Sequence, residues 1–360
     1  MLRKQTMSRL VVHLSPAYFS PESNIGGGER YAEELARAMS ARENVRFISF
    51  GPRQIREQLT PSYERVILKN RSKKRMMPFS EHLFSALVSA DIIHCHQYFV
   101  LPTFLAAAFG KLMGKKVFVS DLGGAGWTPG FHVDQSRWIS AHLPISQYAA
   151  KNLPGRNKNH CVILGGIDMA LYQMRSELEH DGSIVFLGRI LPHKGIHYLI
   201  AGLPEKSVLK VIGPVGNQDY YNQLVHQARG KSVQFISGLS DGEVMAHLLS
   251  AMALVHATPV DQHGQAGANE LFGLAPVEAM ASGCVPILSE AASLPELIDD
   301  KRSGLLVPPN DPTAIRNAIL TLQEDKRYWR QLSLGARKRA EEKFSWEKVV
   351  DRCLHAYALA

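Results

Sequence analysis

The sequence predicts an α/β protein of two domains, each built on a parallel β-sheet. Short apolar runs rich in β-branched residues alternate with longer helical patterns along nearly the whole chain, and this alternation is typical of βαβ units. The length of 360 residues suits two domains of ordinary size, each able to bury its own core. We therefore expect two Rossmann-like domains whose parallel sheets face a central cleft.

The two halves of the chain show the same rhythm. In the first half, strands are expected at residues 10–14, 45–50, 91–95, 116–120 and 161–164. The helices between them are expected at residues 28–40, 81–89 and 101–113. In the second half, strands are expected at residues 183–187, 208–212, 233–236, 253–256 and 285–288.

A polar segment at residues 168–181 separates the two series, so the predicted domains span residues 1–168 and 169–340. Residues 341–360 form a third segment, in which apolar and aromatic side chains recur at helical spacing, namely Trp346, Val349, Val350, Cys353, Leu354 and Tyr357. This spacing indicates a helix with one buried face.

Composition favours a soluble globular protein. Hydrophobic residues make up 45% of the chain and charged residues 21%, which are ordinary values for such proteins. Apolar stretches such as residues 100–109 are too short to span a bilayer. The first ten residues lack the apolar core of a signal peptide, so we expect a cytoplasmic protein.

Cysteine usage indicates the redox compartment, and net charge indicates the kind of partner. The four cysteines, at positions 95, 161, 284 and 353, are widely spaced, as free thiols in a reducing compartment are. The net charge of +8 suits a phosphorylated substrate, an anionic membrane surface or nucleic acid. No nucleic-acid-binding motif accompanies this charge, so we expect no nucleic-acid partner.

Two carboxylates, Glu270 and Glu278, flank a short loop that opens a helix. The loop follows a strand and a glycine-rich segment at residues 261–268, which places it at the carboxyl ends of parallel strands, where open α/β sheets bind ligands. The N–H groups of Gly273 and Leu274 at the helix start favour an anion, and Glu278 could accept hydrogen bonds from ribose hydroxyls. Together these groups suit a sugar nucleotide. A surface helix with an acidic first turn is the plainer alternative.

Two cations, Arg189 and Lys194, bracket a proline turn in the segment GRILPHKG, which follows the first strand of the second half. Both side chains could converge on one phosphate group, the guanidinium as a two-pronged donor and the ammonium as a point charge. Solvated cations in an ordinary loop are the alternative for this segment taken alone. No Asp-x-Asp pair is placed to hold a divalent ion between phosphates, so we expect neither a metal nor another cofactor.

In the first half, the segment IGGGER at residues 25–30 begins a helix after the first strand and a long loop. Gly27 and Gly28 allow the backbone to approach a ligand closely, and the helix start offers N–H donors. The spacing departs from G-x-G-x-x-G, which argues against a nicotinamide cofactor.

The segment DIIHCHQ at residues 91–97 places His94 and His96 on the same side of a strand end. A zinc ion held by these histidines together with Cys95 and His13 is one alternative. Cys95 should point to the opposite face, however, and the sequence suggests no fourth ligand. A buried histidine satisfied by backbone groups is a further alternative for His94.

These segments together resemble the signatures of family 4 glycosyltransferases, which are retaining enzymes of the GT-B fold. The segment ELFGLAPVEAMA resembles the family's E-[ST]-F-G-L-x-x-x-E-A-M-A, with Leu271 as the one departure. GRILPHKG resembles G-R-[LI]-x-x-x-K-G, GGGER resembles G-G-x-E-R, and DIIHCH resembles D-[VI]-[VI]-H-x-H. The resemblance spans nearly the whole chain and is strongest over residues 188–309.

The resemblance implies a role for each matching residue. Arg189 and Lys194 would hold the donor diphosphate, and Glu278 would hold the ribose. Glu270 would bind the sugar hydroxyls together with the backbone of Phe272, Gly273 and Leu274.

In the first half, the resemblance implies that Gly27 and Gly28 close over the phosphates and that His96 supports the sugar. It also implies that the terminal helix packs back on the N-terminal domain. The residues expected to take part in catalysis are His96, Arg189, Lys194 and Glu270.

The acceptor side departs from the family. Members commonly show T-x-H-[DG] where this chain has SDLGGAGW, residues 120–127, so the acceptor class is open and we assign Asp121, Gly123 and Gly124 to it. The basic run at residues 65–77 could dock on anionic lipid, which would place the protein at the inner face of the membrane and favour a lipid-linked acceptor. A solvated loop is the more common form of such a run.

We therefore expect a retaining, metal-independent glycosyltransferase that moves a sugar from a nucleoside diphosphate sugar to a hydroxyl of a glycan, a lipid-linked molecule or a small molecule. A hydrolysing epimerase is an alternative in the same fold, and a phosphorylase would need a pyridoxal-binding lysine that the sequence does not suggest. A non-catalytic subunit that binds nucleotide sugar is a further alternative. The intact set of Arg189, Lys194, Glu270 and Glu278 argues against that last class.

Overall fold

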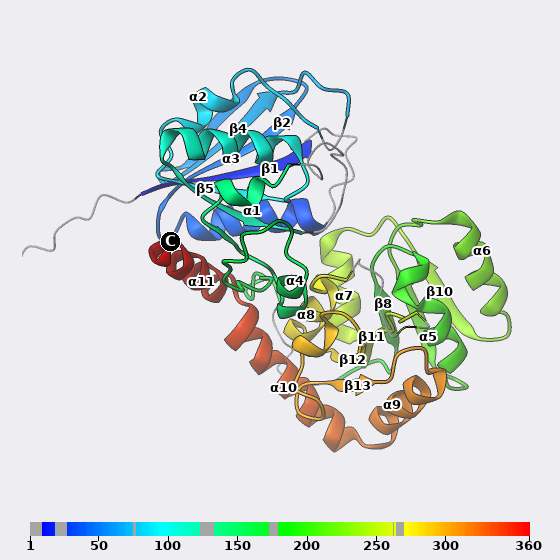
Figure 1. Cartoon of the computed structure of the whole chain (residues 1–360). Helices are drawn as coiled ribbons and strands as arrows, with labels where there is room; N and C mark the ends of the chain where they lie inside the picture. The colour runs from blue at the N-terminus through cyan, green and yellow to red at the C-terminus, as the bar shows by residue number, and fades with distance from the viewer. Residues whose placement is uncertain are drawn as a thin grey trace, which may run out of the picture. The chain divides into compact units, whose positions relative to one another are not determined.

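A computed structural model of the chain describes residues 9–18, 27–74, 77–122, 133–172, 179–261, 263 and 270–360. The chain divides into two compact units (Figure 1), the first made of Met1–Gly166 with Trp346–Ala360 and the second of Ile167–Ser345. The division falls close to the expected boundary. Residues 173–178 of the polar segment lie outside the described residues.

The first unit contains a seven-stranded sheet in the order β3-β4-β2-β1-β5-β6-β7. Its strands are β1 (Leu10–Tyr18), β2 (Asn44–Gly51), β3 (Ile55–Thr60), β4 (Tyr63–Lys69), β5 (Ile92–His96), β6 (Lys116–Ser120) and β7 (Ala141–His142). All neighbouring strands are parallel except β3 and β4. The strand order reverses at β1, so the carboxyl ends of β1 and β5 border a switch point, the place where open sheets bind ligands.

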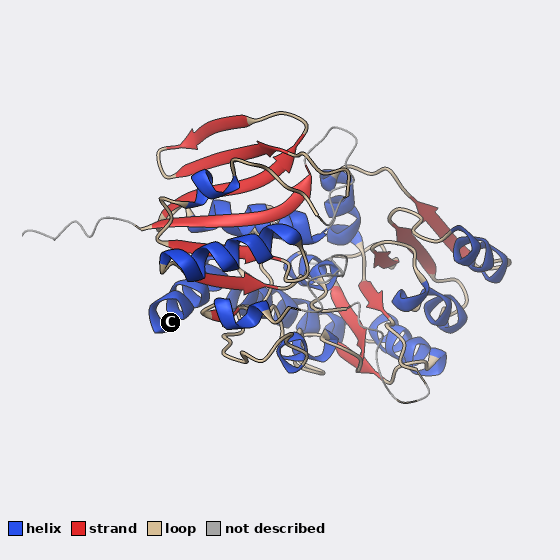
Figure 2. Ribbon diagram, turned by 45° about the horizontal axis from the view of Figure 1, so that its top comes forward, coloured by secondary structure: helices blue, strands red, loops and turns tan. Residues whose placement is uncertain are grey.

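Helices cover both faces of this sheet (Figure 2). They are α1 (Gly27–Met39), α2 (Leu83–Leu87), α3 (Leu101–Met113), α4 (Gln147–Lys151) and α11 (Trp346–Leu359), with a short 3-10 helix, η2, at Gln135–Trp138. Val12, Ile93 and Cys95 belong to a core with residues of α2 and α3. Because side chains alternate along a strand, His13 and His94 face the opposite layer, where Met39 of α1 and Tyr357 of α11 contact them.

Two details of the first half differ from the sequence expectation. Residues 161–164 form no strand; they follow an isolated bridge between His142 and His160. Conversely, part of the basic run is the strand β4, which forms an antiparallel hairpin with β3. The apolar positions of β4, such as Val66 and Leu68, are buried, but charged residues beside them hide the pattern in the sequence.

The second unit contains six parallel strands in the order β10-β9-β8-β11-β12-β13. They are β8 (Ile184–Leu187), β9 (Val208–Ile212), β10 (Ser232–Ile236), β11 (Ala253–His256), β12 (Val285–Ser289) and β13 (Leu305–Val307). The five strands expected in this half are all confirmed. The order reverses between β8 and β11, which makes the carboxyl ends of these two strands the switch point of the sheet.

Helices pack on both faces of the second sheet. They are α5 (Ile196–Gly202), α6 (Gln218–Gln227), α7 (Asp241–Ser250), α8 (Leu274–Ala281), α9 (Pro312–Glu324) and α10 (Lys326–Phe344), with the 3-10 helices η3 (Pro192–Lys194) and η4 (Leu294–Glu296). Ile184 and Phe186 belong to a core with residues of α5 and α9. Val185, between them, packs with residues of α7 and α8 on the opposite face. Both faces are therefore buried, as expected for a parallel sheet.

The last helix, α11, belongs to the first unit, where it packs against α1. The expected terminal segment started at residue 341, but residues 341–344 are the end of α10, and α11 begins at Trp346. The Trp346 ring lies 5.3 Å from that of Tyr31 and covers Gly166 so closely that a Cβ there would come within 2.4 Å of a ring carbon. The contacts of Trp346 thus attach the start of α11 to the first unit.

We expect Trp346→Ala to destabilise the first unit by about 3–5 kcal/mol, because it removes a large buried ring and leaves a cavity. The measurement is urea denaturation followed by circular dichroism. Leu359→Ala, at a side chain that is 72% exposed in the same helix, is the matched control and should change the free energy of unfolding by less than about 0.5 kcal/mol. Equal effects of both variants would contradict the role assigned to Trp346.

Candidate active site

The residues predicted to bind a donor in the second unit lie in the loops that leave β8 and β11 and in α8, the helix that follows the second of these loops. Lys194 is the last residue of η3, which follows β8, and Glu270 lies just before α8, which follows β11. These are the two strands between which the sheet order reverses. The fold therefore brings both loops to the switch point of the second sheet.

Lys194 and Glu270 form an ion pair between the lysine Nζ and Oε2 of the carboxylate. Their side chains are only 14% and 8% exposed. Burial acts to raise the pKa of Glu270, but the opposing effect of the Lys194 charge holds that pKa below its ordinary value. Glu270 is therefore a carboxylate near neutral pH, and its charge depends on Lys194.

Gly195 allows the loop after β8 to approach the end of β11. Its φ of 67° lies in the left-handed region, and a Cβ there would lie 1.8 Å from the carbonyl oxygen of Ala257. Only glycine combines this backbone angle with such close contact. The close approach of Gly195 to Ala257, the residue after β11, positions the neighbouring Lys194 beside Glu270.

Ser293 holds the backbone of the Glu270 loop through hydrogen bonds. Its fully buried hydroxyl donates to the carbonyl oxygens of Glu270, at 2.8 Å, and of Phe272, at 3.0 Å. Gly273, with a φ of 100°, is the N-cap residue just before α8. Within the described part of the chain, no side chain caps this helix start, so its first N–H groups keep the partial positive charge of a helix N-terminus.

His256, at the end of β11, is a polar residue of this site that belongs to none of the motifs found in the sequence. Its Nε2 lies 3.0 Å from the carbonyl oxygen of Leu187 and must donate there, because a carbonyl only accepts. Burial lowers the pKa of His256 to about 4, so the ring is neutral and Nδ1 has a bare lone pair. Among the described residues that buried Nδ1 has no partner. The signal in the sequence that could have identified His256 is its position at the end of an expected strand.

Arg189 and Glu278 are not part of the ion pair. Arg189 is exposed at the start of the loop after β8 and helps to lower the pKa of His193, behind the larger effects of burial and of Lys194. Glu278 is partly buried within α8. The structure joins Lys194 directly to Glu270, and the expected convergence of Arg189 and Lys194 on one phosphate stays a prediction.

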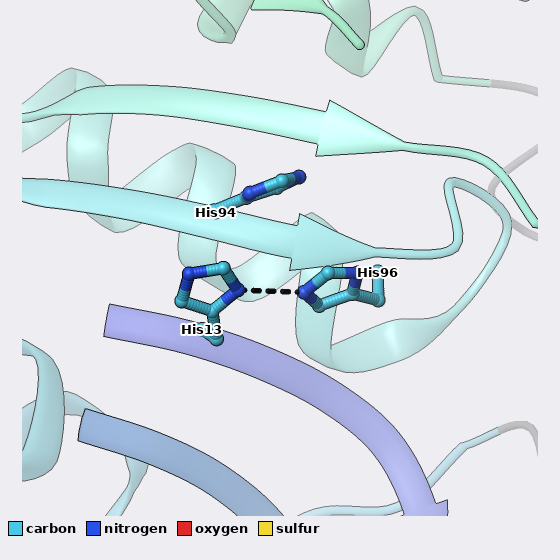
Figure 3. A group of neighbouring side chains, drawn as sticks. All are labelled: His13, His94 and His96. Carbon is cyan, nitrogen blue, oxygen red and sulfur yellow. Dashed lines mark hydrogen bonds between the residues drawn. The ribbon is translucent and has the colours of Figure 1, made fainter. Parts of the chain in front are cut away.

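In the first unit, three histidines gather at the switch point of the sheet (Figure 3). His13 of β1 lies in register with His94 of β5, and His96 follows two residues later on the same side. The ring centroids of His94 and His96 are 4.6 Å apart, and all three side chains are buried. The expectation that His94 and His96 share one side, and Cys95 the other, is confirmed.

Hydrogen bonds connect these rings to their surroundings. Nδ1 of His94 lies 2.7 Å from the Tyr357 hydroxyl, and its Nε2 lies 2.8 Å from the Ser120 hydroxyl. Nδ1 of His13 lies 3.0 Å from Nε2 of His96 (Figure 3). Burial lowers the pKa of His13 and His94, and it lowers that of His96 to about 3. The three rings are therefore neutral at physiological pH.

The same three rings are a candidate metal centre, since a ring nitrogen from each lies within 4.8 Å of the others. Both nitrogens of His94 are already paired with hydroxyl groups. A tightly bound zinc needs at least three protein ligands, and only His13 and His96 offer nitrogens without hydroxyl partners. The described donor set therefore fits a hydrogen-bonded network better than a zinc site.

The other predicted residues of the first unit are placed only in part. Gly27 and Gly28 form the first turn of α1, and Asp121 follows β6. Gly123 and Gly124, predicted for the acceptor, lie outside the described residues.

The basic run at residues 65–77 has several of its charges neutralised. Arg65 of β4 donates to Glu57 at 2.7 Å, and Arg71 pairs with Glu81. Exposed cations of the run include Lys69, Lys73 and Lys74; residues 75 and 76 lie outside the described part. Over the described helices, none reaches the combination of length and apolar character that a membrane crossing requires.

Two family models match the chain. The model for glycosyl transferases group 1 matches residues 172–339, and the model for glycosyltransferase family 4 matches residues 25–122. Each match lies within one of the two units.

Individual proteins are also similar to this chain. An uncharacterised glycosyltransferase of Methanocaldococcus jannaschii is 24% identical over 307 residues, which cover 75% of this chain and 75% of that protein. The O-antigen chain mannosyltransferase B of Escherichia coli is 38% identical over 193 residues, covering 51% of this chain and 47% of that protein. The Anabaena protein HepE in complex with UDP matches with a TM-score of 0.74 at 17% identity, over 97% of this chain and 100% of the other.

We expect Lys194→Met to lower the free energy of unfolding by about 3–5 kcal/mol near neutral pH, because it leaves the buried Glu270 carboxylate without its partner. Without Lys194, burial raises the pKa of Glu270 above its unfolded value. The loss of stability is then fully present above that raised pKa and shrinks as the pH falls through it. Urea denaturation at about pH 7 and about pH 5 measures both effects.

Lys338→Met is the matched control for this variant. Lys338 is 75% exposed and lies 3.8 Å from Glu342 on the surface of α10, so its removal should cost less than about 0.5 kcal/mol at either pH. A loss in Lys194→Met that does not change with pH would contradict the dependence of the Glu270 charge on Lys194.

Proposed function

This chain belongs to the glycosyl transferases group 1 family, and we propose that it transfers a sugar from a nucleoside diphosphate sugar to a hydroxyl acceptor, with retention of configuration and without a metal ion. It is a glycosyltransferase of the GT-B fold. The observation that supports the proposed mechanism most is the buried ion pair between Lys194 and Glu270 at the switch point of the second sheet.

The ion pair has hydrogen-bonding capacity left for both parts of a sugar nucleotide. The ammonium of Lys194 has three donors, of which Glu270 uses one. We assign the other two to oxygens of the diphosphate. The second oxygen of the Glu270 carboxylate is an acceptor, which we assign to a hydroxyl of the sugar. The ion pair would thus contact both the diphosphate, through Lys194, and the sugar, through Glu270.

Positive charge around the diphosphate would promote departure of the leaving group. As the bond between sugar and phosphate breaks, negative charge grows on the diphosphate, and preorganised donors at that point stabilise the transition state. Lys194, Arg189 and the uncapped start of α8 supply such charge and N–H donors. They would do the work that a divalent ion does in metal-dependent transferases, which is why we propose a metal-independent reaction.

We assign the remaining contacts with the sugar nucleotide from the positions of the residues in the fold. We assign Glu278, in the second turn of α8, to the ribose hydroxyls, and Phe272 to Leu274 to the sugar through their backbone. HepE has been solved with UDP and with UDP-glucose, and this supports a nucleotide-sugar donor for a protein of the same fold. We assign Asp121 to the acceptor, whose class stays open between a glycan, a lipid-linked molecule and a small molecule.

We also propose that the first unit contacts an anionic membrane through its basic run. Lys73 and Lys74 are exposed, and so are the nearby rings of Phe79 and Phe84, at 38% and 41%. Phe84 contacts Phe109 of α3, whose last turn exposes two further apolar side chains, Leu112 and Met113. Lysines next to exposed apolar groups are the combination that binds the surface of anionic bilayers.

For the donor, we expect one class of nucleotide sugar to raise the melting temperature of the purified protein, because a ligand that binds only the native state stabilises it. UDP-, GDP- and ADP-sugars are to be compared in a thermal shift assay. Transfer from the selected donor should fall roughly 100-fold or more in Arg189→Ala and Glu270→Gln and should persist in EDTA. Lys206→Ala, at an exposed lysine of the same unit, is the control.

Three outcomes would contradict the assignment. Stabilisation by no nucleotide sugar would count against the donor site. Release of free nucleotide without any acceptor would indicate a hydrolysing epimerase instead. Full transfer activity in Glu270→Gln would remove the ion pair from the mechanism.

For the membrane, we expect the protein to co-sediment with vesicles that contain anionic lipid and not with vesicles of neutral lipid alone. Lys73→Glu with Lys74→Glu should lower the partition coefficient onto the anionic vesicles by roughly 30-fold or more, since each cation lost near an anionic surface removes about 1 kcal/mol and the new carboxylates are repelled. Lys301→Glu with Lys338→Glu makes the same charge change at exposed positions of the second unit. Equal losses in the two double variants would contradict a specific docking face.

A further inference from the structure

His96 faces the switch point of the first sheet with one ring nitrogen that lacks a partner. Its Nε2 lies 3.0 Å from Nδ1 of His13, but its Nδ1 is buried and, among the described residues, has no hydrogen-bond partner. A buried polar atom without a partner is costly unless a ligand satisfies it. Whether that ligand must donate or accept depends on which nitrogen of His96 has the proton.

Met39 decides where the proton of His13 lies. Nε2 of His13 lies 3.3 Å from the thioether sulfur of Met39, and a thioether can only accept a hydrogen bond. Nε2 of His13 must therefore be the N–H that donates to the sulfur. Because the buried ring of His13 is neutral, its Nδ1 has a lone pair and can only accept.

The tautomer of His96 follows from that of His13. Two bare nitrogens facing each other at 3.0 Å would repel, so Nε2 of His96 must have the proton and donate to Nδ1 of His13. A neutral imidazole has only one N–H group. Nδ1 of His96 is consequently an acceptor, which a carbonyl or carboxylate cannot satisfy but a hydroxyl can.

We propose that His13 is a positioning residue: with Met39 it holds His96 in the Nε2–H tautomer, so that the bare Nδ1 of His96 accepts a hydrogen bond from a hydroxyl of a sugar substrate. This inference rests on the proposed transferase function for the identity of the hydroxyl. The tautomer itself rests on the contacts among Met39, His13 and His96 and on the burial that keeps the two rings neutral.

The backbone around His96 supports a fixed ring. Gln97, the next residue, has a φ of 82°, which is uncommon for any residue except glycine. Its N–H donates to the carbonyl oxygen of Ser120 at 2.7 Å, and its own carbonyl accepts from the Thr103 hydroxyl at 2.7 Å. Strained backbone held by several hydrogen bonds is a feature of sites that need one side chain in one orientation.

The direct test is NMR of protein labelled with 15N-histidine, without any substrate. We expect a scalar coupling across the N–H···N bond between His96 and His13, with the proton bonded to Nε2 of His96. His96→Gln assigns the signal, because the coupling should vanish there. A proton found on Nδ1 of His13 instead would overturn the inference, since Nδ1 of His96 would then be a donor.

Two substitutions of His13 separate positioning from packing. His13→Asn keeps an amide oxygen close to where Nδ1 lies, so it can still accept from His96, whereas His13→Phe keeps the ring volume and loses the acceptor. We expect kcat/KM for transfer to fall roughly tenfold in His13→Phe, as loss of one hydrogen bond predicts, and to recover to within about twofold in His13→Asn. Equal activity in the two variants would overturn the inference.

Met39→Leu tests the tautomer with little change in volume. Without the sulfur, Nε2 of His13 loses its acceptor, and we expect a second population of molecules in which the proton lies on Nδ1 of His13. An unchanged single tautomer would show that Met39 does not select it. Binding of the selected nucleotide sugar, compared with its nucleoside diphosphate, then places the hydroxyl: a loss in His13→Phe for the nucleotide sugar alone assigns it to the donor, and unchanged binding with slower transfer assigns it to the acceptor.

The tautomer of His96 and the transfer of a sugar can each fail without the other. If the NMR signals are as expected but the protein transfers no sugar, the positioning of His96 by His13 stands and the transferase proposal fails. If transfer is observed but the proton lies on His13 Nδ1, the positioning fails and the function stands.

Discussion

The buried contact between Lys194 and Glu270 is the interaction on which the arrangement of the second unit depends most. Neither charge could remain in so dry a place without the other. The pair joins the loop after β8 to the loop after β11, and Gly195 and Ser293 prepare the backbone on either side for that contact. The compensating charge on the opposite loop thus helps to define the position of each loop.

Both units place a neutral histidine at the carboxyl end of a switch-point strand. His96 ends β5 and His256 ends β11, and each has one nitrogen bonded to the protein and one buried nitrogen without a partner among the described residues. Burial keeps both rings uncharged. A neutral ring with a bare nitrogen discriminates between ligand groups by hydrogen-bond direction, whereas the ion pair discriminates by charge.

The parts of the fold that the sequence predicted are those with strong local patterns. The strands of the second half, such as β8 and β11, are continuous apolar runs bounded by turns, and such runs need no tertiary information. The hairpin of β3 and β4 was missed because charged residues such as Glu64 and Arg65 interrupt its apolar pattern. At residues 161–164 the apolar pattern is present but the strand is not. These residues form no strand in the structure, and the pairing next to them is an isolated bridge between His142 and His160.

The sequence by itself determined the fold class, the family and the segments that contain the candidate site, because motif spacing and hydrophobic period are local properties. Tertiary structure alone decided which of those residues meet. Lys194 pairs with Glu270 across 76 positions of the chain, and Met39 meets His13 through the packing of α1 on β1. Charge compensation and the choice of a histidine tautomer depend on neighbours in space, and spacing along the chain does not specify them.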